Sequence, residues 1–480
     1  MCIKVKQLGI DFGSSKTSLV ACYATRDEKS QKEVNKFCII CEPRTSAPFF
    51  GSYMGEIRQD NVTSYLYFQD VFNSDSSAEV VLWDDLKKTF PNNFEHVKNF
   101  FAQIKNVVTK KREDGIYFDF SGLEKIVFGH PAYSEPGVAS GYCKKMTQLL
   151  KTVFFENEKC EIIGCPEPVL AASAYDRVCV GRENRMKQGD VLLVIDLGGF
   201  TMDLALLQME YNKKALTVFQ HIPSGSIHGY VSMGQEMTRR ITRVVYDDRS
   251  ISFFDPKIES MKCELFKKDD CATRKTRRKY SISKYPKGKE CFILRYSEDI
   301  NIPSNLDDET ICVTMKNGNY NISIEDIYDS CADCIEHYLS NVSLKSSQNF
   351  HVLFTGGTSG IAELRNTILN RLRARYTIEE ENVKVVGVQE NINEIPFMCE
   401  NEDFSTSNAV ALGAAFVARG DVIFKTEKKL KSKPKSLSEE EIRGIINKLY
   451  DSQYANVSIR EKIKACKTLN DLEELKALLK

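Results

Sequence analysis

The sequence predicts an α/β protein in which two similar lobes each begin with a strand, a glycine turn and a second strand. In GDVLLVIDLGGFTMDLALL, residues 189–207, a Leu-Gly-Gly turn separates two apolar runs. An uninterrupted apolar run is typical of a strand buried on both faces, and paired glycines are typical of a tight turn that a ligand can approach. Asp196 interrupts the first run, and Asp203 lies near the start of the second.

The same pattern opens the chain. LGIDFGSSKTSLVACY places Asp11 and Gly13 where the later segment has Asp196 and Gly198, an offset of 196 − 11 = 185 residues. Two such turns facing each other would offer backbone N–H groups to phosphates and two carboxylates to a cation. A buried carboxylate is costly unless its charge is compensated, which a magnesium ion beside a phosphate would do. The alternative for one segment alone is a structural hairpin with a stray acid.

Three further segments alternate strands with helices. Each combines a short apolar run, a turn marked by glycine or proline, and a helical pattern. The segments are KIVFGHPAYSEPGVASGYCKKMTQLL, CEIIGCPEPVLAASAYD and FHVLFTGGTSGIAELRNTILNRL, followed by TSNAVALGAAFVARG, a helix whose small residues permit close packing. We expect residues 1 to about 43 to form strands.

The composition indicates a folded protein but does not indicate its function. The 480 residues include 66 basic and 66 acidic side chains, a balance that argues against a protein devoted to nucleic acid. The cation-rich run 274–279 contains no interleaved aromatic residue that could stack bases, so we interpret it as a solvated loop. No apolar run has the length of a signal peptide core or a membrane span, and we expect a soluble, cytoplasmic protein.

Two CxxC pairs stand out among the sixteen cysteines. Cys38 and Cys41 lie in a predicted strand, whereas Cys331 and Cys334 lie in a predicted amphipathic helix. The spacing alone is compatible with a zinc site or a redox pair. We expect free thiols instead, because residues three apart in a strand face opposite sides.

Taken together, these segments resemble the nucleotide-binding region of the heat shock protein 70 (DnaK-like) chaperones, in the superfamily of actin and sugar kinases. The resemblance covers roughly residues 8–420 and rests on IDFGSSKT, GHPAYSEPGVASGY, PEPVLAASAYD, IDLGGFTMD, LFTGGTSGI and AVALGAA, in that order. It implies a two-lobed actin-like ATPase fold with duplicated ribonuclease H-like lobes. Lobe I would span 1–188, with an outer subdomain at about 44–120, and lobe II 189–420, with an outer subdomain at about 231–310 and a return helix.

The resemblance also implies roles for individual residues around Mg-ATP. Asp11 and Asp196 would hold Mg²⁺ through waters, and Glu167 would orient the attacking water, with Asp203 in support. The predicted catalytic group is Glu167, Asp196, Asp11 and Thr201. The predicted nucleotide contacts are Gly13, Ser14, Ser15, Lys16, Gly198, Gly199, Phe200, Glu259, Lys262, Gly356, Gly357 and Thr358.

The chain departs from the family pattern at several of these positions. Phe200 replaces the third glycine of the second phosphate loop, and Gly360 replaces an arginine that would cover the base. Lys16 stands where the chaperones usually have an aromatic residue, and it either approaches the phosphates or lies at the surface. The catalytic lysine that the family carries in the outer part of lobe I has no identified match in residues 51–90. We therefore expect nucleotide binding with slow hydrolysis.

Residues 421–480 are predicted to form a basic linker and a small helical tail. Ser438 and Glu441 have the spacing of a capping box. The apolar faces of the tail would either pack together or dock a protein partner. We expect no peptide-binding domain of the chaperone kind in so short a segment. The first interpretation is an ATP-dependent chaperone-like switch; the alternatives are an actin-like filament protein and a small-molecule kinase of the same superfamily.

Overall fold

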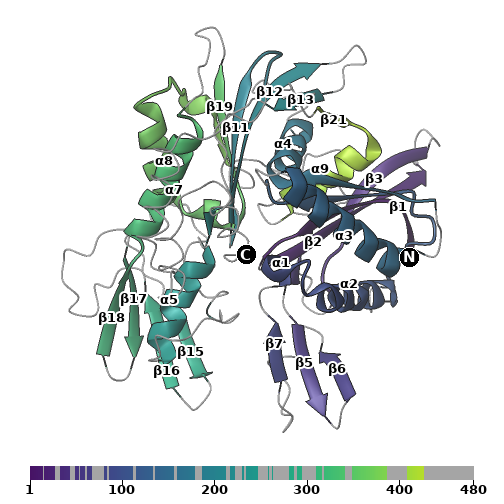
Figure 1. Ribbon diagram of the computed structural model, residues 1–480, viewed down its shortest axis with the longest axis horizontal. Coiled ribbons are helices and arrows are strands. Elements are labelled where there is room, and N and C mark those ends of the chain that lie inside the picture. Colours follow the sequence, from purple (N-terminus) through teal and green to yellow (C-terminus); the bar gives the residue numbers. More distant parts are fainter. Residues whose placement is uncertain are drawn as a thin grey trace, which may run out of the picture. The chain divides into compact units, whose positions relative to one another are not determined.

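The fold is described from a computed structural model (Figure 1). It describes residues 1–14, 16–26, 33–43, 49–52, 54–59, 62–66, 80–83, 86–111, 115–132, 136–155, 159–178, 186–199, 201–211, 217–221, 230–231, 234–246, 258, 262, 280–285, 289–294, 310–315, 318–340, 349–385 and 408–425. The chain divides into two compact units, Met1–Thr426 and Glu427–Lys480. The second unit, with the predicted helical tail, lies outside the described residues.

Sheet I is built from the first part of the chain and contains seven strands. Its strands are β1 (Cys2–Phe12), β2 (Lys16–Arg26), β3 (Glu33–Ile39), β4 (Phe50–Gly51), β8 (Tyr117–Asp119), β9 (Lys125–His130) and β10 (Glu161–Pro166). The helices of this part are α1 (Leu86–Thr89), α2 (Phe94–Thr109), α3 (Pro136–Phe154) and α4 (Glu167–Val178). A separate three-stranded sheet consists of β5 (Met54–Gln59), β6 (Val62–Leu66) and β7 (Val80–Trp83).

Sheet II follows and also contains seven strands. Its strands are β11 (Val191–Leu197), β12 (Thr201–Tyr211), β13 (Thr217–His221), β14 (Tyr230–Val231), β19 (Phe350–Thr355), β20 (Val383–Val385) and β21 (Val422–Lys425). The helical segments are α5 (Gly234–Tyr246), α7 (Glu325–Tyr338), η2 (Gly357–Gly360), α8 (Ala362–Arg373), η3 (Glu380–Asn382) and α9 (Ala409–Arg419). A four-stranded sheet comprises β15 (Tyr280–Tyr285), β16 (Lys289–Leu294), β17 (Thr310–Met315) and β18 (Gly318–Ser323).

Five strands of sheet I and five of sheet II follow the same order. Sheet I runs β10-β9-β1-β2-β3, and sheet II runs β20-β19-β11-β12-β13. In both, the central strand pairs antiparallel with the next strand along the chain and parallel with a later one. The outer pairs also agree in direction. The repeated motif of the sequence therefore marks a repeat of strand order and direction.

The predicted mixed α/β architecture is confirmed. The expected strands in residues 1–43 are β1 to β3, and the strand-turn-helix segments form β9 with α3, β10 with α4, and β19 with η2 and α8. Residues 422–425, which we assigned to the linker, form β21 and pair with β13. Run 274–279, which we interpreted as a loop, lies outside the described residues, and β15 begins directly after it. Among the described helices, none is long and apolar enough to cross a membrane.

Each large sheet packs apolar side chains on both faces. Helices α4 and α9 contribute to one cluster that also contains Val20 and Val127 of sheet I and Val194 and Leu353 of sheet II. We call the faces that contribute to this cluster the inner faces. Helices α2 and α3 cover the other face of sheet I, and α7 and α8 cover that of sheet II. Helix α5 joins the latter cluster beside β17 and β18. The hydrophobic effect thus orients the strands and places both inner faces against the same two helices.

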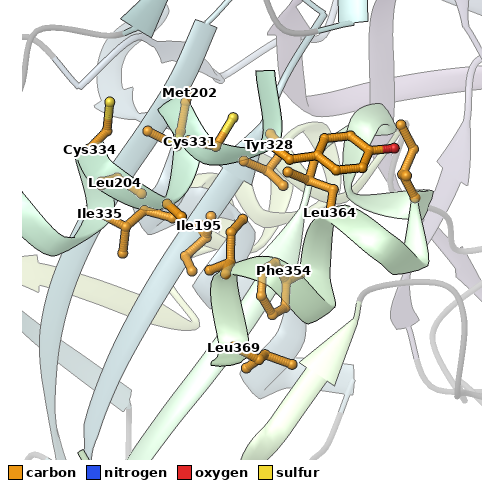
Figure 2. Close-up of a cluster of buried hydrophobic side chains, with 14 of the residues drawn as sticks. Ile195, Met202, Leu204, Tyr328, Cys331, Cys334, Ile335, Phe354, Leu364 and Leu369 are labelled. Atoms are coloured by element: carbon orange, nitrogen blue, oxygen red, sulfur yellow. The ribbon is translucent and has the colours of Figure 1, made fainter. Parts of the chain in front are cut away.

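The second CxxC pair lies in the cluster on the outer face of sheet II. Figure 2 shows Cys331, Cys334 and Ile335 of α7 among the side chains of this cluster, together with Met202 and Leu204 of β12. Both are buried thiols, and burial raises the pKa of Cys331. Within the described part of the chain, none of the four CxxC cysteines takes part in a disulfide.

Glycines bring α9 into close contact with its neighbours. A Cβ atom at Gly413 would overlap the backbone carbonyl of Leu170 in α4, and one at Gly9 would overlap the carbonyl of Ala411. Gly9 and Gly413 therefore let β1, α9 and α4 approach backbone to backbone. This approach fixes the position of α4, whose first residue is Glu167.

We predict that Gly413→Ala destabilises the protein by about 1–3 kcal/mol or more, because the added methyl group separates α4 from α9. Gly141→Ala in α3 is the matched control, since Gly141 is exposed and open space surrounds its Cα. The control is expected to gain up to about 1 kcal/mol from helix propensity. Thermal unfolding of both variants is the measurement. Equal stability of Gly413→Ala and wild type would contradict the close packing.

Candidate functional site

Two predicted acids occupy matching places in the two sheets. Asp11 lies near the end of β1 and Asp196 near the end of β11. Their strand neighbours alternate faces: Ile10 and Ile195 pack in the outer clusters, whereas Val194 packs in the inner one. Because strand side chains alternate, both carboxylates belong to the inner faces. The repeat thus gives each sheet an acid on its inner face, beside the turn that follows.

Lys87 connects this region to α4. The Nζ atom of Lys87 lies 2.7 Å from Oε1 and 2.9 Å from Oε2 of Glu167, and both side chains are almost fully buried. Glu167 begins α4 between two prolines, where an acid is favoured by the helix dipole. A Cβ atom at Gly129 would lie 2.8 Å from Cγ of Glu167, so this glycine gives the glutamate its space. The ion pair is therefore held by α1 and α4 beside β9.

Asp203 links sheet II to the segment after β9. Its Oδ1 accepts a hydrogen bond from the backbone N–H of Ala132 at 2.7 Å, and its Oδ2 accepts one from the hydroxyl of Thr201 at 2.8 Å. In the antiparallel register Asp203 lies opposite Asp196. The predicted residue Thr201 thus acts here as a partner of an acid, at the first position of β12.

Burial and mutual repulsion raise the pKa values of the acids. Burial raises the pKa of Asp11 to about 6 and that of Glu167 to about 8, against the opposing effect of Lys87. Burial also raises the pKa of Asp196 well above its ordinary value, and repulsion from Glu167 and Asp203 adds to the effect. Burial alone would lower the pKa of Lys87, but Glu167 and Asp11 raise it above the ordinary value. The cluster therefore carries more negative charge than its lysine compensates.

His130 adds no compensating positive charge to this cluster. The residue ends β9, and its Nδ1 lies 2.8 Å from the backbone carbonyl of Pro131, to which it donates. Burial lowers the pKa of His130, although the Pro131 hydrogen bond and Asp203 oppose this effect. The imidazole of His130 is therefore neutral near pH 7.

A second group of predicted residues gathers at the turn after β11. The hydroxyl of Thr358 donates to the carbonyl of Gly198 at 3.0 Å, and Nζ of Lys262 donates to the carbonyl of Gly234 at 2.6 Å. The backbone N–H of Gln235 in α5 donates to the carbonyl of Gly199 at 2.6 Å. These contacts bring the turn, η2, Lys262 and the N-terminus of α5 together.

Gly356 joins this group to the carboxylates. Its φ of 83° lies in the region that favours glycine, and a Cβ there would overlap Oδ1 of Asp196 and lie 2.5 Å from the carbonyl oxygen of Leu197. Any larger residue would displace Asp196. Gly357, the first residue of η2, has open space around its Cα.

The first glycine turn, which follows β1, is also tight. A Cβ at Gly13 would overlap the carbonyl of Lys16, which shows how tightly the chain turns after β1, and Ser14 follows in the same turn. The ammonium of Lys16 lies 4.4 Å from the centre of the Phe49 ring. Ser15, Phe200 and Glu259 lie outside the described residues.

The donor set suits a hard divalent cation with oxygen ligands. Within the described part of the chain, no three His, Cys, Asp or Glu side chains form a ready metal site. Asp11 and Asp196 would therefore hold Mg²⁺ only together with water or phosphate oxygens, as this ion usually requires. The uncompensated negative charge of the cluster would be balanced by such an ion.

The structure adds residues that the sequence analysis did not assign. Lys87 is the main one, and its neighbour Lys88 has the same side chain in the same short helix, so no sequence signal distinguishes the two. Asp203, by contrast, already had a supporting role through the resemblance. The repeat alone would not have indicated it, since 203 − 18 = 185 matches it to Ser18.

We predict that these acids make the ligand-free protein less stable as the pH rises. A folded-state pKa above the unfolded value means that the folded protein binds more protons, so stability falls from about pH 4 through the raised pKa values near 6 and 8. The Asp196→Asn variant should become more stable than wild type as the pH rises, because it lacks one buried charge.

Thermal unfolding between pH 5 and 8.5, without nucleotide or divalent cations, measures this difference. Asp326→Asn is the control, because Arg240 lowers the pKa of that exposed acid and its contribution stays constant in this range. A constant difference between wild type and Asp196→Asn would contradict the account.

The comparisons with known proteins assign no family to this chain. No protein-family model matches it, and no curated protein matches it at a significant level. The motifs and contacts described above are therefore the grounds for a functional proposal.

Proposed function

We propose that the protein binds Mg-ATP between two actin-like lobes and acts as a slowly hydrolysing, chaperone-like conformational switch. The observation that carries the proposal is the pairing of Asp11 and Asp196. Both acids belong to the inner faces of sheets with the same strand order, and a glycine turn follows each one. A metal-bound polyphosphate is a ligand that would satisfy both acids and both turns at once.

The phosphates would bind at the two turns. Backbone N–H groups of the turns near Gly13 and Gly198 would face them, and Mg²⁺ would neutralise phosphate charge and balance the two aspartates. The nucleoside would extend toward Gly356, Thr358 and Lys262, which support this side of the site through their contacts with the second turn and Asp196.

Hydrolysis of ATP to ADP and phosphate would depend mainly on positioning and charge. Lys87 supplies a buried positive charge next to the acids, and its two contacts with Glu167 orient that carboxylate. Glu167 would in turn orient the attacking water and accept its proton. Asp203 supports the arrangement by connecting Thr201 with the backbone of Ala132.

The switch follows from the placement of the acids in two sheets. A ligand that binds Asp11 and Asp196 together would favour arrangements in which the two acids are close, and release would remove this preference. The resemblance of the motifs to the heat shock protein 70 nucleotide-binding region favours a chaperone-like switch over the filament and kinase alternatives.

We predict that Asp11→Asn and Asp196→Asn each weaken Mg-ATP binding by about tenfold or more, equivalent to about 1.4 kcal/mol. Both variants should bind ATP in EDTA as weakly as wild type, because the lost charge acts through the metal. Calorimetric titration measures both affinities.

Asp190→Asn is the matched control for this experiment. Asp190 is a buried aspartate that contacts His351 at 3.0 Å, just before the start of β11 and far along the strand from Asp196. Unchanged Mg-ATP affinity in both Asp11→Asn and Asp196→Asn would eliminate the proposed metal site.

We also predict that Glu167→Gln retains Mg-ATP binding but hydrolyses bound ATP roughly a hundredfold more slowly, because glutamine cannot accept the proton of the attacking water. Single-turnover hydrolysis and equilibrium binding, measured on the same preparations, separate the two effects. Equal single-turnover rates would exclude the role of Glu167. A wild type that binds ATP without hydrolysing it would retain the switch and lose the enzymatic part of the proposal.

A further inference from the structure

A row of three polar residues crosses sheet II on its inner face. Asp203 of β12 lies opposite Asp196 of β11, which in turn lies beside Thr355 of β19. The residues two positions away in the same strands are Ala205, Val194 and Leu353, and all three pack in the inner cluster. Because strand side chains alternate, Asp203, Asp196 and Thr355 share this face.

Thr355 is unusual in its surroundings. The residue is fully buried, and its hydroxyl has no hydrogen-bond partner among the described residues. A valine would have the same shape in this strand without a polar group to desolvate. The hydroxyl therefore costs stability in the ligand-free protein unless another state gives it a partner.

The corresponding position in sheet I is different. Ile10 pairs with Phe128 of β9, as Ile195 pairs with Phe354 of β19. The next residue along the parallel neighbouring strand is Gly129 in sheet I and Thr355 in sheet II. Gly129 leaves room for the side chain of Glu167. The acid of sheet I thus has a glycine beside it on the parallel neighbouring strand, whereas Asp196 has a threonine.

The carboxylate of Asp196 extends toward the end of β19. A Cβ at Gly356, directly after Thr355, would clash with its Oδ1. Rotation about χ1 of Thr355 changes the direction of its hydroxyl and leaves the backbone unchanged. In the parallel register, Asp196 is the acid directly beside Thr355.

We propose that Thr355 is a positioning residue: its hydroxyl donates a hydrogen bond to the Asp196 carboxylate when that carboxylate faces the Mg²⁺ of a bound nucleotide. This inference rests on the proposed function. The bond would hold Asp196 in one orientation toward the cation, so its loss weakens the use of Mg²⁺ rather than the binding of the nucleotide itself.

Thr355→Val and Thr355→Ser test the role of the hydroxyl. The valine variant keeps the shape and should need roughly tenfold more free Mg²⁺ for half-maximal ATP binding, whereas the serine variant should stay within about threefold of wild type. Without ligand, Thr355→Val should unfold at an unchanged temperature or roughly 1–4 °C higher, because the unpartnered hydroxyl is gone. ATP affinity in EDTA should equal that of wild type in both variants.

Thr242→Val is the matched control. Its hydroxyl is also buried, and it donates to the carbonyl of Thr238 within α5 at 2.7 Å. The Mg²⁺ dependence of this variant should equal that of wild type. Thr355→Ala, which also lacks the hydroxyl, replaces the valine variant if the latter fails to fold.

The outcomes distinguish the two proposals. A wild type without Mg²⁺-dependent ATP binding would overturn the proposed function itself. If wild type binds Mg-ATP and Thr355→Val shows the same Mg²⁺ dependence, only the role of Thr355 is overturned. An equal loss of affinity in Mg²⁺ and in EDTA would also overturn it, because a positioning residue for the metal ligand affects only the first.

Discussion

Four carboxylates lie within electrostatic reach of one buried ammonium, and much of the surrounding structure serves to hold them there. Lys87 contacts Glu167 directly, and Asp11, Asp196 and Asp203 contribute further negative charge. Such a group is costly in the absence of a ligand, because like charges are removed from water together. The apolar clusters on both faces of the two sheets offset this cost and keep the strands that carry the acids in place. The protein thus retains an unfavourable arrangement of charge, as functional sites often do.

Close packing turns the strand ends into a defined site. Gly9 and Gly413 let α9 and α4 approach β1, and Gly129 gives the Glu167 side chain its space at the start of α4. On the side of sheet II, Gly356 makes room for Asp196, while Thr358 and Gln235 hold the turn after β11. At each of these glycines, a Cβ would clash with a backbone carbonyl or an acidic side chain. The positions of the acids therefore depend on small residues far apart in the sequence.

The sequence predicts the local elements that carry the acids better than the contacts between distant residues. The hairpins that carry Asp11 and Asp196 were predictable because the same apolar run and glycine turn occur twice. The helix that begins at Glu167 was predictable from its small residues and the adjacent prolines. The role of Lys87 was not predictable, because it depends on how α1 packs against α4, and the neighbouring Lys88 has the same side chain. Asp203 was assigned only through the resemblance, because the first repeat has a serine at the matching place. Thr355 is an ordinary strand residue until its register beside Asp196 is known. Strand pairing and long-range packing, rather than local pattern, decide which polar residues meet.

The central claim is that one ligand engages the glycine turns of both sheets. Amide hydrogen exchange measures this most directly, because it reports on the segments 12–17 and 197–201 separately in one titration of the wild-type protein with Mg-ADP. The account predicts that exchange slows in both segments over the same range of ligand concentration, and that EDTA removes this protection. Protection of one segment alone, or protection confined to other parts of the chain, would contradict a site shared by the two sheets.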